Sequence, residues 1–495
     1  MRINVIALFT SILVLTLAAA APAQADPPYI TYKLKMMTFE MNNDPLPILS
    51  WSITGRKSSH IVVPIWDDKT AKHWLFQHDL NHRGKTDRLS LVIPITDVEL
   101  FDADSALIEL EEGQISAAAF GDTIIFVLAQ HRYPDWGILE VEYLGFDSKG
   151  ETPIARTPLL HLEAPFNQSI PLFKVAAGAG PDTIAVVFCA NYAENISNST
   201  VYVSSRIYFA EIDLSGNRIW PIEQLDLPND GNLRISIASN PVHNGNGWVI
   251  PLIINRLKWA TNPNGQQVSQ IAGNDLYVAA ITGAPDKRKT RLRKVAFNND
   301  NTQFAYAEAH LLPHTGTAAA GNAVGKPAQN SGSLILFFSE KNFIPLEQRT
   351  LENFTKDYYA ATIDKRGKKS GPTVIVDVPE WDHNLIYGPN KKSVRFHNDY
   401  ISKPLLGEDG EYYFAQARTV RLREGQSLYQ QEHECAIYSF NPVSGEVMTV
   451  ARGTNNWGGS FRQPLLRWFN GKLAAINTFD TTSKEYRFYF SKVKP

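Results

Sequence analysis

Ile212-Asp213-Leu214-Ser215-Gly216 follows an apolar run, and the same pattern of strand and turn returns along the chain. The other copies are His78-Asp79-Leu80-Asn81-His82-Arg83-Gly84, Phe146-Asp147-Ser148-Lys149-Gly150, Ile363-Asp364-Lys365-Arg366-Gly367 and Asn441-Pro442-Val443-Ser444-Gly445. Glycine ends each copy because a tight hairpin needs a residue that adopts positive φ. Gly84, Gly150 and Gly216 are equally spaced, and a degenerate turn at 280–286 divides the longer interval that follows. This period predicts repeated units of supersecondary structure.

A second turn precedes each of several units. It reads Asn240-Pro241-Val242 before Asn246-Gly247, Pro404-Leu405-Leu406 before Asp409-Gly410, and Pro464-Leu465-Leu466 before Asn470-Gly471. Short runs rich in Val, Ile, Phe and Tyr flank both kinds of turn, so each unit reads as four antiparallel strands. The second strands of the units fall at 61–66, 123–129, 183–189, 248–254, 333–338, 411–415 and 472–476.

The last unit stops after its third strand, at 486–493, and the strand expected at 30–41 has no unit of its own. Pairing of these two strands would close a circular array and remove its open edges. We therefore predict an all-β, seven-bladed β-propeller of four-stranded antiparallel blades, with the ring closed by the N-terminal strand. Two or three β-sandwiches in series are the alternative, although they leave the recurring pair of turns unexplained.

The N-terminus has the pattern of an export signal. Arg2 precedes an apolar run at 5–21, and Ala23-Gln24-Ala25 is a small-x-small cleavage pattern before Asp26. We expect a signal peptide at 1–25 and a single propeller domain at 26–495. No later run is long and apolar enough to span a membrane. The expected location is therefore outside the cytoplasm, in the periplasm or the extracellular space.

Composition excludes several classes of protein. Lys and Arg number 48 against 50 Asp and Glu, which argues against a strongly basic nucleic-acid binder. Two cysteines exclude a disulfide-rich scaffold. Cys189 and Cys435 fall in different predicted blades, so we expect both to be unpaired and buried. Phosphate-loop, haem and zinc-protease motifs are missing from the sequence, and His73, His78 and His82 are spaced poorly for one ion, so we expect no cofactor and no metal.

The connectivity sends alternate loops to opposite faces of the predicted disc. Short turns join the first strand to the second and the third to the fourth. Longer, polar and aromatic segments, including 131–136, 191–194 and 255–259, form loops on the other face, which we call the upper face. Polar groups at the ends of the second strands, such as Asn191, are expected to form a solvent-facing ring there. The candidate ligand-binding residues on it are Asp67, Arg132, Trp136, Arg256, Trp259, Glu340, Trp381, His383, Arg418 and Trp457. Aromatic rings beside Asn, Asp and Arg suit sugars. The basic run 287–294 is expected to form a solvated turn.

Two stretches resemble the blade starts of sialidase-like (BNR-type) propellers. They are Asn240-Pro241-Val242-His243 with Gly247-Trp248, and Phe461-Arg462-Gln463-Pro464 with Asn470-Gly471-Lys472. The resemblance implies that Arg462 belongs to an arginine set that holds a substrate carboxylate; Arg256 and Arg418 are added by position. The family's Ser-x-Asp-x-Gly-x-x-Trp box is absent from the sequence.

These observations favour an exported propeller that binds a carbohydrate or a protein partner on its upper face, without catalysis. One alternative is a carbohydrate-active hydrolase or lyase of sialidase-like type, with carboxylates such as Asp67 and Glu340 as acid and base. Another is a structural subunit of an envelope complex. No catalytic residue is assigned, and whether the protein is an enzyme stays open.

Overall fold

The computed structural model describes about two thirds of the chain. The described residues are 29–32, 51–54, 59–67, 72–80, 86–94, 115–120, 123–132, 135–146, 153–196, 199–219, 221–226, 233–261, 265, 267–283, 287–298, 304–313, 332–342, 356–379, 395–407, 409–421, 432–456, 460–469, 472–480 and 485–490.

The described strands form seven antiparallel sheets, numbered here in chain order. Sheet 1 contains β2 (Trp51–Thr54), β3 (Ser59–Asp67), β4 (Lys72–Leu80) and β5 (Thr86–Pro94). Sheet 2 contains β6 (Ile115–Phe120), β7 (Thr123–Arg132), β8 (Asp135–Phe146) and β9 (Pro153–Glu163). Sheet 3 contains β10 (Gln168–Ala179), β11 (Ile184–Ile196), β12 (Ser199–Ile212) and β13 (Glu223–Leu225). Sheet 4 contains β14 (Leu233–Ile237), β15 (Val242–His243), β16 (Gly247–Thr261), β17 (Gln267–Thr282) and β18 (Lys289–Asn298).

The remaining sheets repeat this order. Sheet 5 contains β19 (Phe304–Pro313), β20 (Leu334–Asn342), β21 (Lys356–Ile363) and β22 (Lys369–Val376). Sheet 6 contains β23 (Arg395–Ile401), β24 (Leu405–Leu406), β25 (Tyr412–Arg421), β26 (Glu432–Phe440) and β27 (Val447–Asn456). Sheet 7 contains β28 (Ser460–Phe469), β29 (Lys472–Asp480) and β30 (Glu485–Phe490), and β1 (Tyr29–Tyr32) pairs with β30 as its outer strand.

The predicted all-β fold of antiparallel sheets is confirmed. Each second strand expected from the sequence coincides, within one residue at its start, with part of β3, β7, β11, β16, β20, β25 or β29, the second strands of their sheets. Short polar turns produce this regularity. The Asp213 carboxylate accepts hydrogen bonds from the backbone N–H groups of Ser215 (2.9 Å) and Asn217 (2.8 Å), and Gly216 adopts a φ of 79°. Asp364 and Gly367 form the same turn between β21 and β22.

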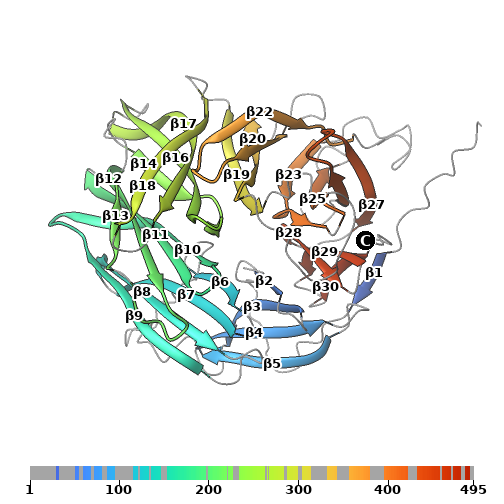
Figure 1. Ribbon diagram of the computed structural model, residues 1–495, viewed down its shortest axis with the longest axis horizontal. Coiled ribbons are helices and arrows are strands. Elements are labelled where there is room, and N and C mark those ends of the chain that lie inside the picture. The colour runs from blue at the N-terminus through green and yellow to red at the C-terminus, as the bar shows by residue number, and fades with distance from the viewer. Residues whose placement is uncertain are drawn as a thin grey trace, which may run out of the picture.

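The sheets follow one another in chain order around a common centre (Figure 1). Contacts join β2 to β6, β6 to β10, β10 to β14, β16 to β19, β19 to β24, β23 to β28, and β28 to β2. The ribbons of β1 and β30, which belong to opposite ends of the chain, lie side by side.

Apolar side chains fill the space between neighbouring sheets from sheet 2 to sheet 7, where the structure describes them. In β16, residues 248–255 are buried without interruption, so both faces of the strand are covered. Ile250, Leu252 and Ile254 pack with sheet 3, whereas Val249 and Ile253 pack with sheet 5. An unbroken apolar run is the pattern expected of a strand that is buried on both faces. The core of this protein is therefore a series of apolar layers between sheets.

A buried polar cluster also links sheets 3 and 4. Glu211 of β12 accepts hydrogen bonds from the Thr183 hydroxyl (2.5 Å) and from Trp248 Nε1 (3.3 Å), and it forms an ion pair with Arg288. The Arg288 side chain is 5% exposed, and burial lowers its pKa. Its guanidinium also lies over the Phe209 ring, 5.2 Å from the centroid. Because a buried charge must be paired, this cluster fixes how the two sheets meet.

Several segments expected to be upper-face loops are strands. Residues 131–132 end β7, 135–136 begin β8, 191–194 lie in β11 and 255–259 lie in β16. Their polar side chains hid the strand pattern, yet the backbone continues to pair: Arg256 lies opposite Gly273 and Trp259 opposite Ser269. The described part of the chain contains no helix long and apolar enough to cross a membrane. Residues 315–333, whose glycines and alanines are typical of one long insertion, lie between β19 and β20, and most of them are outside the described residues.

Gly178→Ala tests the junction of sheets 3 and 4. A Cβ on Gly178 would lie 2.0 Å from the carbonyl oxygen of Pro241, so one backbone must move. We expect the free energy of unfolding to fall by about 1–3 kcal/mol, the usual result of overpacking. Urea denaturation measures this loss, and Ala179→Ser at the neighbouring exposed position is the control. Equal stability of the two variants would contradict the close approach.

Candidate functional site

The sequence-predicted candidates that fall in described segments lie in upper halves of strands, away from the first-to-second-strand hairpins. Asp67 ends β3, Arg132 ends β7, Trp136 begins β8, Arg256 and Trp259 lie in β16, Glu340 lies in β20, Arg418 in β25 and Arg462 in β28. Trp381, His383 and Trp457 lie outside the described residues. The structure likewise does not describe the side chains of Asp67, Arg132, Trp136 and Arg462. Glu340 and Arg418 are partly buried in sheets 5 and 6.

Arg256 belongs to a charged triad that crosses three strands of sheet 4. Asp275 of β17 is the central member, and its side chain is 2% exposed. Its Oδ2 lies 3.4 Å from Arg256 Nε and 3.0 Å from Lys294 Nζ of β18. The side chains of Arg256 and Lys294 are 34% and 42% exposed. One buried carboxylate therefore holds two cations whose outer atoms reach solvent.

The electrostatics of the triad are those of a stable ion cluster. Burial disfavours the charge on Lys294, but the hydrogen bond and the proximity of Asp275 raise its pKa overall. The Lys294 ammonium also lies 5.5 Å from the centroid of the Tyr277 ring. Both cations are attracted to the same carboxylate oxygen, Asp275 Oδ2. Asp275 therefore anchors the two cations.

Backbone geometry positions the arginine. Arg256 lies opposite Gly273, and the register of β16 with β17 shifts directly after this pair. A Cβ on Gly273 would lie 2.2 Å from one terminal guanidinium nitrogen of Arg256. Glycine thus leaves the space in which the guanidinium lies flat across β17 beside Asp275. The β16–β17 hairpin continues above the triad and carries Trp259, which is 44% exposed.

Asn191 departs from the expected ring of solvent-facing polar groups. It is fully buried, and its Nδ2 donates to the carbonyl oxygens of Leu172 (3.1 Å) and Ile235 (3.0 Å). Its Oδ1 accepts from the Ile235 N–H (2.7 Å) and from the Ser205 hydroxyl (2.7 Å). Asn191 therefore joins β10, β12 and β14. In sheet 4, the buried Asn274 side chain similarly donates to Asn255 Oδ1 at 2.6 Å.

A cavity of about 220 Å³ lies beside Asn191, between sheets 3 and 4. Lys174, Cys189 and Ser236 contribute its polar lining. Cys189 is unpaired and buried, as predicted, and its Sγ donates to the Ile235 carbonyl oxygen over 3.7 Å. Burial raises the pKa of its thiol to about 11. The side chain of Cys435 lies outside the description.

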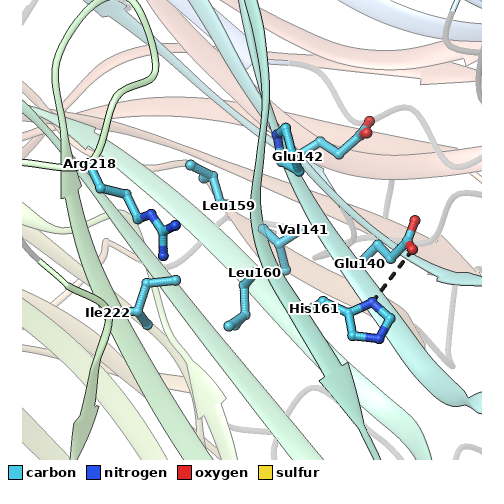
Figure 2. A pocket seen from close by; sticks show the side chains of 9 residues that line it. Glu140, Val141, Glu142, Leu159, Leu160, His161, Arg218 and Ile222 are labelled. Carbon is cyan, nitrogen blue, oxygen red and sulfur yellow. Dashed lines mark ion pairs between the residues drawn. The ribbon is translucent and has the colours of Figure 1, made fainter.

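A wider groove of about 450 Å³ opens between β8 and β9 of sheet 2 and the segment that precedes β13 of sheet 3. Figure 2 shows Arg218 and Ile222 on one side of it, facing Leu159 and Leu160, with His161 beside Glu140. The His161–Glu140 distance is 3.6 Å, and Glu163 lies 3.2 Å from the other ring nitrogen. This groove lies on the outer edge and contains none of the predicted candidates.

Sequence reasoning found Arg256 and Trp259 but not Asp275 or Gly273. The available signal was Gly273-Asn274-Asp275, a polar interruption between apolar parts of one strand. Lys294 was noticed only in the basic run 287–294. That run is a solvated turn only at its start, because 289–294 lie in β18 and Arg288 is buried in the cluster with Glu211. Among the residues that the structure describes, no group of three or more His, Cys, Asp or Glu could hold a metal ion.

Comparisons with known proteins give structural likeness alone. No family model and no curated protein matches the chain. Pyrococcus horikoshii acylaminoacyl peptidase is similar with a TM-score of 0.39 and 12% identity over 90% of this chain and 51% of its own. Trypanosoma rangeli sialidase in complex with 2,3-difluorosialic acid has a TM-score of 0.39 and 9% identity, over 94% and 58%. The β-propeller domain of the Trilobed protease from Pyrococcus furiosus has a TM-score of 0.36 and 10% identity, over 91% and 95%. Likeness at these TM-scores carries no argument about ligand or activity.

Gly273→Ala and Arg256→Ala form a double-mutant cycle on the triad. Arg256→Ala leaves the buried Asp275 with Lys294 alone, and we expect the free energy of unfolding to fall by about 1–3 kcal/mol. Gly273→Ala should cause part of this loss, because its methyl group displaces the guanidinium. The double variant should then be about as stable as Arg256→Ala. Losses that add, measured by urea denaturation, would contradict the positioning role of Gly273.

Cys189 should resist alkylation in the folded protein. At pH 8, a buried thiol with a pKa of about 11 is almost wholly protonated, so iodoacetamide should modify it at least about 100-fold more slowly than an exposed cysteine. Peptide mass spectrometry measures the rate at Cys189 alone. Ser215→Cys on the exposed turn is the internal reference, and denaturant should make the two rates similar. Equal rates in the folded protein would disprove the burial.

Proposed function

We propose that the chain is a seven-bladed β-propeller at 26–495, closed by the pairing of β1 with β30 and preceded by a signal peptide at 1–25. The described strands form seven sheets, each in contact with the next, and β28 returns to β2; these observations support the ring. Sheets that pack on two neighbours also fit a propeller better than separate sandwiches. The cleavage pattern supports export to the periplasm or the extracellular space.

The proposed function is binding, without catalysis, of a carbohydrate on the upper face; a protein ligand is the other outcome of the test below. The Arg256–Asp275–Lys294 triad carries this proposal. It places two partly exposed cations at fixed positions, since both are tied to one buried carboxylate. Ligand donors that are held in place before binding lose less conformational entropy when the ligand arrives.

Two side chains of the β16–β17 hairpin suit a polar ligand with apolar faces. An arginine has five N–H donors in a fixed plane, and a third of the Arg256 side chain remains exposed for contacts beyond Asp275. Trp259 extends from the same hairpin and exposes its ring, which can stack on a sugar. The Asp275 side chain is 2% exposed and contacts both cations, so a ligand would meet the cations rather than the carboxylate. The carboxylates suggested as an acid–base pair, Asp67 and Glu340, belong to sheets 1 and 5, which are not neighbours.

A glycan array and a panel of chromogenic glycosides test the proposal together. The purified protein should bind glycans on the array and release no chromophore. Trp259→Ala and Arg256→Ala should each weaken binding about tenfold or more, because stacking and charged hydrogen bonds are each of the order of 1–3 kcal/mol. The matched controls are Ile219→Ala and Arg218→Ala, an exposed apolar residue and an exposed cation of sheet 3.

The outcomes separate the classes of function. Chromophore release that is lost in Arg256→Ala would replace binding with catalysis. Absence of glycan binding, together with capture of a protein that depends on Trp259, would move the proposal to a protein ligand. If neither Trp259→Ala nor Arg256→Ala changes any interaction, the upper-face site is wrong.

A further inference from the structure

The outer strand of sheet 4 is unusually basic. Lys289 and Arg291 are exposed, and Arg293 on the same face of β18 is partly buried. The opposite face carries Arg288 and Lys294, whose charges are neutralised by Glu211 and Asp275. Within the part of the chain that the structure describes, no carboxylate lies within ion-pair distance of Lys289, Arg291 or Arg293. One face of β18 therefore carries three positive charges that no described carboxylate neutralises.

A second basic segment meets this face from sheet 5. The turn between β21 and β22 contains Lys365, Arg366 and Lys368, which are all exposed. Asp364 lies in this turn too, but its carboxylate accepts the backbone N–H groups of Arg366 and Lys368. Two segments that are far apart in the sequence thus bring at least six cations to one seam between the sheets. We call this region the basic seam.

Packing fixes the two segments side by side. A Cβ on Gly367 would lie 2.5 Å from the Cβ of Ala280, so the turn rests directly on β17. Ala280 pairs with Arg291, and Val278 pairs with Arg293. Directly opposite residues of an antiparallel pair have Cβ atoms about 5 Å apart. The turn therefore lies beside the basic face of β18. Asn244 strengthens the contact, because its Nδ2 donates to the Lys365 carbonyl oxygen (3.1 Å).

The outer edge of β18 is available for pairing. Among the described strands, β18 pairs with β17 only, and it is the last strand of its sheet. An edge strand presents unpaired N–H and C=O groups to any extended chain. Lysines on an edge strand can also serve simply to prevent such pairing. A basic edge that only prevents pairing should bind no acidic strand, whereas a basic edge that serves as a binding surface should pair with one.

We propose that the basic seam binds an extended acidic segment of a partner protein, which adds to sheet 4 as a strand beside β18. Alternate residues of a strand share a face and lie about 6.6–6.8 Å apart. Lys289, Arg291 and Arg293 have this spacing, so a segment with acidic residues at every second position places each carboxylate opposite a cation. The turn at 364–368 adds cations above the same carboxylates. Opposite charges directly across a strand pair stabilise the pairing.

The test uses the full chain and two short synthetic peptides of equal composition. One has glutamate at every second position, and the other has the same glutamates in one block. The alternating peptide should bind at least about tenfold more tightly in calorimetry at low salt, because only it matches the strand period. Hydrogen exchange measured by mass spectrometry should show new protection of the β18 amides. Binding should weaken as salt is added.

Charge reversal locates the binding surface. The double variant Lys289→Glu/Arg291→Glu should lose the alternating peptide, whereas Arg206→Glu/Arg218→Glu, which changes net charge equally on sheet 3, should keep it. Circular dichroism establishes that both variants fold. Failure of both peptides to bind, equal binding of the two, or unchanged exchange in β18 would overturn the proposal. Arg256 and Trp259 belong to the other end of the sheet, so this result is independent of the glycan test.

Discussion

Apolar side chains on both faces of the second strands bind each of sheets 3, 4, 5 and 6 to the two sheets beside it. In β16, the unbroken buried run 248–255 contacts sheet 3 through Ile250 and sheet 5 through Val249. Neither set of side chains can leave water unless both neighbouring sheets are present. Sheet therefore follows sheet around a common centre, and strand ends, turns and outer strands remain to meet other molecules.

This constraint divides the buried polar groups into two kinds. Asn191 and the Glu211–Arg288 pair lie between sheets, and their partners come from both sides of the junction. Their hydrogen bonds and their ion pair substitute for the interactions with water that these buried groups lose. They also fix how the sheets meet. Asp275 has another role, because both of its partners belong to its own sheet and reach solvent. Its burial holds Arg256 and Lys294 in place at the upper face.

Much of the fold was predictable because turn chemistry is local. In turns such as Asp213–Gly216, a carboxylate accepts hydrogen bonds from two backbone N–H groups and a glycine adopts positive φ. Such a turn needs no distant partner, so it can be predicted from the sequence. The apolar runs placed the second strands for the same reason. The upper ends of strands were harder to predict. Residues 255–259 were expected to form a loop, but cross-strand pairing keeps them extended, and pairing depends on a partner strand that polar side chains do not reveal.

Local chemistry alone determined the all-β class, the turns, the order of strands within a sheet and the candidates Arg256 and Trp259. The tertiary structure decided which polar residues act together. Asn191 has the polarity of a surface residue, but β14 covers it. Asp275 forms ion pairs with residues of β16 and β18, which lie on either side of its own strand. The basic seam required Gly367 to rest on Ala280, which brings residues 289–293 beside 364–368. Ion pairs and close packing act over a few ångströms in space, and a sequence records only distance along the chain.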